Sequence, residues 1–284
     1  MHSTREQALR HIEDLASRSQ WQGVYRRTML WDFAAEARMA FQLTFLRPFA
    51  VPRMADVLVN TGHITAHPER RAYDTGLLIH EIIADGLDGQ RARHAISHMN
   101  RAHRSPGVLQ EDLAYVLSAF VVVPIRYLTR VGWRPLLPVE IEATVRFYQR
   151  LGELMNIHWA PASYQEAADH FDDYEHRMIA RSVSGVRLGS DVIAVLRQRM
   201  PAPARRLAGP LFASQLADDR VLHALGISGG SPVVRQAVAH AIQAHRVLTA
   251  RRPAPTGPSF TPGQPAGRIY LHGYQLRDLT KSDL

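Results

Sequence analysis

Three histidines fall within one short stretch of the chain, and imidazole is the side chain best suited to bind a metal ion or move a proton near neutral pH. They are His94, His98 and His103, in the segment 89–103, whose apolar period predicts a helix. At about 100° per residue, His103 closes the apolar stripe that contains Ile96, whereas His94 and His98 lie on the opposite side. We therefore expect His103 to face the core, as a histidine bonded to a backbone carbonyl or as a buried ligand.

His94 and His98 are four residues apart, so both rings could reach one metal ion. The polar side of this helix offers no third ligand nearby. The simpler interpretation is two solvated side chains.

An arginine and a threonine begin an otherwise apolar stripe in the segment 70–86. Arg71 and Thr75 are i, i+4 neighbours, and Leu78 and Ile82 continue their face. An inward guanidinium needs an anionic or strongly polar partner. The alternative is that Arg71, in the first turn, extends to the surface.

A second arginine follows the most apolar segment of the chain. Arg126 comes after thirteen uncharged residues, 113–125, on a helix expected to bend or end near Pro124. Its guanidinium could meet a buried carboxylate of a cofactor or pair with an Asp or Glu of another helix.

Helical periodicity dominates the chain, and the strict alternation typical of strands is scarce, so we expect an all-α fold. Helices are predicted near residues 4–18, 32–46, 50–60, 71–85, 89–103, 109–130, 138–155, 163–182, 186–199, 203–215, 218–225 and 231–250. Residues 1–250 form the predicted domain. The segment 251–267 holds five prolines and three glycines, so 251–284 is predicted to be a flexible linker and tail, whose last residues dock on the body or a partner or stay free.

Composition excludes several chemistries. The 284 residues include no cysteine, which rules out disulfides, cysteine zinc sites, iron–sulfur clusters and a thiolate-bound haem. The net charge of +8 comes from scattered arginines, so we expect no nucleic-acid partner. The run 113–125 is short of the roughly 20 residues that span a bilayer, and no apolar leader is seen. We expect a cytoplasmic protein without stable membrane insertion.

The order and spacing of several motifs together resemble the mpaB-type oxygenases, relatives of the latex clearing proteins (rubber oxygenases), in a bacterial form. The resemblance covers roughly residues 20–230. The motifs are Leu30-Trp31-Asp32, Arg71-x-x-x-Thr75, Met99-Asn100-Arg101-Ala102-His103, Glu111-Asp112, Pro124-Ile125-Arg126, Gly132-Trp133-Arg134-Pro135 and Met155-Asn156-Ile157.

The resemblance implies a globin-like multi-helix fold that holds haem b. His103 matches the family's axial iron ligand, and Arg71 and Thr75 match its pair near the haem. Arg126 becomes the candidate partner of a haem propionate. The second ring nitrogen of an axial histidine usually has an acceptor. Asp112 or Asn156 is the candidate for that role.

Two departures from the family pattern bear on the reaction. Asp74 stands where latex clearing proteins have a lysine, and Glu81 is only a substitute candidate for their acid–base glutamate. We expect a haem b oxygenase that uses O₂ on an apolar isoprenoid or lipid-like substrate, by oxidative C=C cleavage. The alternatives are a haem enzyme of another reaction type, such as a peroxygenase or a catalyst of rearrangement, and a non-catalytic helical binding module.

Overall fold

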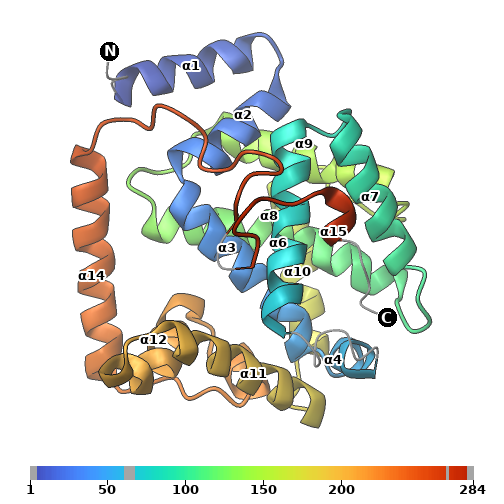
Figure 1. Ribbon diagram of the computed structural model, residues 1–284, viewed down its shortest axis with the longest axis vertical. Helices are drawn as coiled ribbons and strands as arrows, with labels where there is room; N and C mark the ends of the chain where they lie inside the picture. Colours follow the sequence, from blue (N-terminus) through green and yellow to red (C-terminus); the bar gives the residue numbers. More distant parts are fainter. Residues whose placement is uncertain (1–4, 61–67, 267–268, 280–284) are drawn as a thin grey trace.

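The computed structural model describes residues 5–60, 68–266 and 269–279, except for the side chains of residues 68, 69, 71 and 72. Helices account for nearly all regular structure in these ranges, and the all-α prediction is confirmed (Figure 1). They are α1 (Arg5–Ser17), α2 (Trp21–Arg27), α3 (Ala34–Leu46), α4 (Pro52–Asn60), α6 (Pro68–Asp85), α7 (Gln90–Ala102), α8 (Gln110–Val131), α9 (Pro138–Leu154), α10 (Tyr164–Met178), α11 (Val183–Arg199), α12 (Ala208–Leu216), α13 (Asp219–Ala224), α14 (Pro232–Arg251) and α15 (Leu276–Leu279). Three further turns are a π-helical turn (Thr28–Asp32) and 3₁₀ turns at Arg47–Ala50 and Ala202–Leu207.

Helix α8 forms the centre of the molecule. It is apolar on nearly all sides because α3, α9 and α10 all pack against it. The helix continues to Val131, which confirms the predicted range 109–130, so of the two alternatives at Pro124 an end of the helix is wrong. Packing on every side holds the turn that a proline weakens. Among the described residues, only α8 is long and apolar enough to cross a membrane, and 78% of its apolar window is buried inside the protein.

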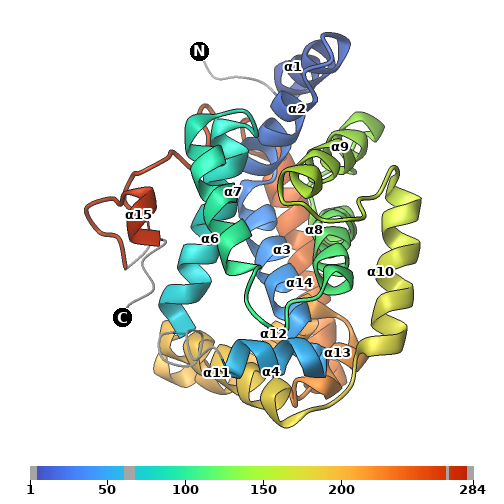
Figure 2. The same ribbon diagram turned by 90° about the vertical axis from the view of Figure 1, so that its right-hand side faces the viewer.

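The other helices form layers around this centre. Figure 2 shows the α6–α7 hairpin on one side of α3 and α8, with α9 and α10 on the other. Helices α11, α12 and α13 cover one end of the molecule, together with α4. Helix α14 runs along the outside of the body (Figure 1). Only Val238 among its residues is buried.

Of the alternatives left open for residues 251–284, the described residues after α14 show docking on the body and not a free tail. We call the described residues 252–266 and 269–279 the C-terminal strap. It crosses the face of α6 and bends back against α7 (Figure 1). Ala254 and Leu279 are buried, as are Tyr270 and Tyr274. A proline-rich composition prevents helices and strands, but an extended segment needs only a few buried anchors.

The strap is also held through its backbone. The Ser259 amide donates to the Leu30 carbonyl at 2.7 Å, and the Tyr274 amide donates to the Gly263 carbonyl at 3.1 Å. Gly273 has a φ of +88°, and a Cβ there would lie 2.5 Å from the Gly263 carbonyl oxygen. The bend therefore requires glycine at this position.

Candidate functional site

His103 directly follows α7, and its amide donates to the Met99 carbonyl at 2.9 Å. The predicted faces are confirmed for Ala92 and Ile96, which are buried, and for His94, which is exposed, whereas His98 is partly buried. The His103 side chain is partly buried, and its Nδ1 is a buried atom without a hydrogen-bond partner. Burial lowers the pKa of His103, and the nearby charge of His98 lowers it further. The lowered pKa favours the neutral form of the ring, whose Nδ1 has no partner.

Asn100 lies one turn before His103 and was not assigned a role from the sequence. Its Nδ2 donates to the Leu154 carbonyl at 3.0 Å, whereas its Oδ1 is buried without a partner. The last part of α7 therefore carries one unpaired buried acceptor and one unpaired ring nitrogen, three residues apart. Residues at i and i+3 are neighbours on a helix, so this spacing was the available signal.

The α6–α7 hairpin sets Thr75 at the same end as His103. The two helices pack together and are joined by the short turn 86–89, so they run antiparallel. Positions early in α6 are therefore level with positions late in α7. Thr75 is partly buried and already takes part in an interaction. Arg71 lies on α6 one turn before Thr75, but its side chain is outside the described residues.

Glu81 and Asp74 are buried and bonded to the strap. Both Glu81 oxygens accept from the Arg91 guanidinium, at 2.5 and 2.7 Å. The Tyr274 hydroxyl donates to Glu81 at 2.6 Å, and the Tyr270 hydroxyl donates to Asp74 at 2.6 Å. Glu81 is completely buried. Its carboxylate is thus engaged in structure and does not fit the predicted acid–base role.

Arg126 points away from the core and pairs with α10. Its guanidinium forms a bidentate pair with Asp172, at 2.8 and 2.7 Å, and both side chains are about half exposed. Of the two partners left open by the sequence, the structure shows the carboxylate of another helix. The guanidinium is therefore not available to a propionate unless this pair breaks.

Asp112 and Asn156 do not contact His103. The Asp112 carboxylate accepts from Arg53 at 2.9 Å and from the Tyr174 hydroxyl. Asn156 is exposed in the turn after α9, with a φ of +55°, and its carbonyl accepts from Gln110. Both residues stabilise local structure, and the predicted acceptor role is not met by either.

Of the residues described in this region, only His103 fits a haem, as a ligand of its iron. Haem iron takes four nitrogens from the porphyrin, so the protein needs to supply only an axial imidazole. The partly buried, neutral ring of His103 has the required chemistry, because an unprotonated nitrogen is the ligand. Across the described ranges no group of three or more His, Asp or Glu residues could hold a bare metal ion.

A family of known proteins matches the part of the chain that contains His103 and the other site residues. The family described as ER-bound oxygenase mpaB/B'/Rubber oxygenase, catalytic domain, matches residues 27–251. At its C-terminal end, the match extends beyond residue 230, where the resemblance in motifs was expected to end. This match covers most of the chain with the catalytic domain of a family of oxygenases. The chain belongs to the mpaB and rubber oxygenase family.

Individual relatives are fungal and distant. The ER-bound oxygenase mpaB of Penicillium roqueforti (strain FM164) is 26% identical over 209 residues, which cover 66% of this chain and 68% of the relative. The ER-bound oxygenase mpaB' of Penicillium brevicompactum is 27% identical over 210 residues, 67% of this chain and 49% of the relative. The chain thus spans about half the length of this second relative.

Proposed function

We propose that the protein is a haem b-dependent oxygenase that uses O₂ on an apolar, isoprenoid or lipid-like substrate, by oxidative C=C cleavage. The observation that carries the proposal is His103, a neutral imidazole with an unpartnered buried nitrogen at the position of the family's axial ligand. The family match supports the oxygenase class.

In this proposal His103 holds the iron, and a bound haem supplies the activation of O₂. Thr75 and Arg71 shape the oxygen side from the facing end of α6. The buried apolar residues of α7, including Ala95 and Ile96, keep water from the ring. Asn100 Oδ1, buried without a partner three residues before His103, would accept a hydrogen bond from the second ring nitrogen when the iron is bound, and so fix the orientation of the imidazole.

The absorption spectrum of the purified, haem-supplemented protein tests the proposal. We expect a Soret band in the wild type that is lost or shifted in His103→Ala. His94→Ala is the matched control, because His94 lies on the same helix and is exposed. Circular dichroism of each variant checks that the helices are intact. A wild type that stays colourless, or a spectrum unaffected by His103→Ala, would refute the assignment.

A second candidate is a haem enzyme that does not cleave C=C bonds, such as a peroxygenase or a catalyst of rearrangement. The observation in its favour is Asp74, which replaces the lysine of latex clearing proteins and is held in structure by Tyr270. A carboxylate bonded in this way cannot take over the role of that lysine. Incubation of an isoprenoid probe under ¹⁸O₂ separates the two candidates, since only cleavage gives labelled aldehyde or ketone.

We also propose a cytoplasmic protein that does not bind nucleic acid or insert α8 into a membrane. The burial of α8 among its neighbours supports this, because insertion would require the core to open. Cell fractionation tests the proposal: recovery with the membrane fraction after a salt wash would contradict it.

A further inference from the structure

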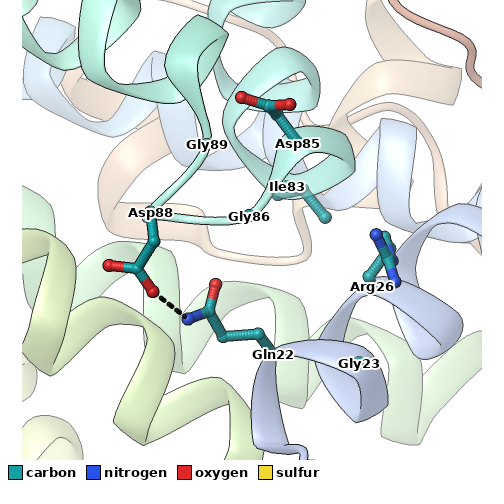
Figure 3. A pocket seen from close by; sticks show the side chains of 8 residues that line it. All are labelled: Gln22, Gly23, Arg26, Ile83, Asp85, Gly86, Asp88 and Gly89. Carbon is teal, nitrogen blue, oxygen red and sulfur yellow. Dashed lines mark hydrogen bonds between the residues drawn. The ribbon is translucent and has the colours of Figure 1, made fainter.

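Two adjoining hollows lie beside α2, near the turn that joins α6 to α7. The smaller hollow, of about 230 Å³, is shown in Figure 3 and contains Asp85 and Asp88. The larger hollow, of about 470 Å³, lies between α1, α2, the end of α6 and residues 258–262 of the C-terminal strap. Gly23 and Arg26 line both hollows. A volume of this size falls in the range of small-molecule sites.

The larger hollow is lined mainly by apolar residues and by cations. Leu30, Trp31 and Phe260 contribute to its apolar walls, and no Asp or Glu lines it. Its three titratable side chains are those of two arginines and a histidine, all able to carry positive charge: His11, Arg26 and Arg27. The hollow thus combines a hydrocarbon surface with cationic side chains, and its lining includes no carboxylate.

Of the two arginines, Arg26 is the one available to a ligand. Arg27 is already bonded to Asp32 at 3.1 Å and lies over the Trp31 ring. Arg26 donates one bond to the Ala84 carbonyl at 3.2 Å and pairs with no carboxylate among the described residues. In Figure 3 its side chain stands apart from Asp88, whose carboxylate accepts from Gln22 at 3.2 Å. The carboxylates of the smaller hollow repel an anion, so the larger hollow is the favourable side.

The larger hollow is distinct from the proposed haem site. It includes Ala84, near the end of α6, whereas Thr75 lies nine residues earlier. At 1.5 Å per residue these positions are about 14 Å apart along the helix. His103 and Thr75 lie toward the opposite end of the α6–α7 hairpin.

We propose that the larger hollow binds a single-chain amphipathic anion, with the head group at Arg26 and the hydrocarbon chain against Trp31 and Phe260. A charged head group gains charge-assisted hydrogen bonds from the guanidinium. The chain buries apolar area against α2 and the strap. Because Phe260 belongs to the strap, the bound ligand also stabilises the strap on the body.

Trp31 provides a direct readout, because a bromine atom in contact with an indole quenches its fluorescence. We would titrate the full-length protein with a terminally brominated undecanoate and measure tryptophan emission. We expect saturable quenching that disappears in Trp31→Phe. Quenching that persists in that variant would place the probe at another tryptophan and overturn the assignment.

The role of the charge is tested with Arg26→Gln and with uncharged probes. We expect Arg26→Gln to weaken binding about tenfold or more, the value of one charge-assisted hydrogen bond. Arg146→Gln is the matched control, since Arg146 is an exposed helical arginine on α9 that pairs with Glu142. Dodecanoate and dodecyl phosphate should compete with the brominated probe, and the tighter competitor identifies the head group. Equal competition by dodecanol, or equal affinity in Arg26→Gln and wild type, would overturn the proposal.

Discussion

Replacing Tyr274 by Phe removes one hydroxyl from the contact between the C-terminal strap and α6. In the structure this hydroxyl donates to Glu81 at 2.6 Å, and the Tyr274 amide donates to the Gly263 carbonyl at 3.1 Å. The ring itself stays in place, so the change isolates the hydrogen bond from the packing. Tyr73→Phe is the control, since Tyr73 lies on α6 and its hydroxyl bonds to none of the described residues.

The size of the effect follows from the partners that remain. A hydrogen bond to a buried carboxylate contributes about 1.5–3 kcal/mol. Glu81 keeps both bonds from Arg91, so the larger penalty of an unpaired buried charge, about 3–5 kcal/mol, does not apply. We expect Tyr274→Phe to favour opening of the strap by about 2 kcal/mol, which is a factor of about thirty in the opening equilibrium.

Hydrogen exchange read by NMR at the amides of Tyr270 and Tyr274 measures this equilibrium. We expect protection at both amides to fall about thirtyfold in Tyr274→Phe, while amides in the middle of α8 stay unchanged because they open with the whole fold. Tyr73→Phe should leave all of them unchanged. Equal protection in Tyr274→Phe and wild type would show that the hydroxyl does not hold the strap.

Three further predictions concern charge. Arg47→Leu should lower the free energy of unfolding by about 3–5 kcal/mol in urea denaturation, because Glu175 is buried and loses its partner at 2.6 Å. The double variant that also carries Glu175→Leu should lose less of this free energy than Arg47→Leu alone. An equal loss in the two variants would contradict the prediction. Arg126→Gln should lower the free energy of unfolding by under about 1 kcal/mol, since the Asp172 pair is half exposed, and a loss several times larger would point to a buried role. Burial lowers the pKa of His80 and of His103 below the unfolded value of about 6.5, so the unfolded chain takes up protons first as the pH falls. The free energy of unfolding, measured by urea denaturation, should therefore decrease below about pH 6.5. A free energy of unfolding that stays constant down to about pH 5 would contradict this prediction.

Helix positions were largely predictable because most helices bury one face. The period of α7 located His103 on its apolar side, and α8 was recognised as a core helix. Residues 21–31 were missed. There α2 runs into the π-helical turn Thr28–Asp32, and a wider turn shifts the apolar phase that periodicity analysis follows.

The site was predicted only in part, since periodicity gives the direction of a side chain and not its partner. His103 was found from its position on a stripe. Periodicity left open whether Arg126 meets a carboxylate of a cofactor or of another helix, and the structure pairs it with Asp172, which lies 46 residues later in the chain. The strap residues that bind Asp74 and Glu81 are even further away, and an extended segment carries no period to reveal its contacts.

The contact between Tyr274 and Glu81 also imposes an order on folding during synthesis. The two residues are separated by 193 positions. At a translation rate of about 5–20 residues per second, Tyr274 emerges on the order of ten to forty seconds after Glu81. During that interval only Arg91 among the side-chain partners of Glu81 has been made. The nascent chain therefore completes this buried cluster only after the segment with Tyr270 and Tyr274 has left the ribosome. A premature stop after α14 removes the tyrosine partners of both Asp74 and Glu81.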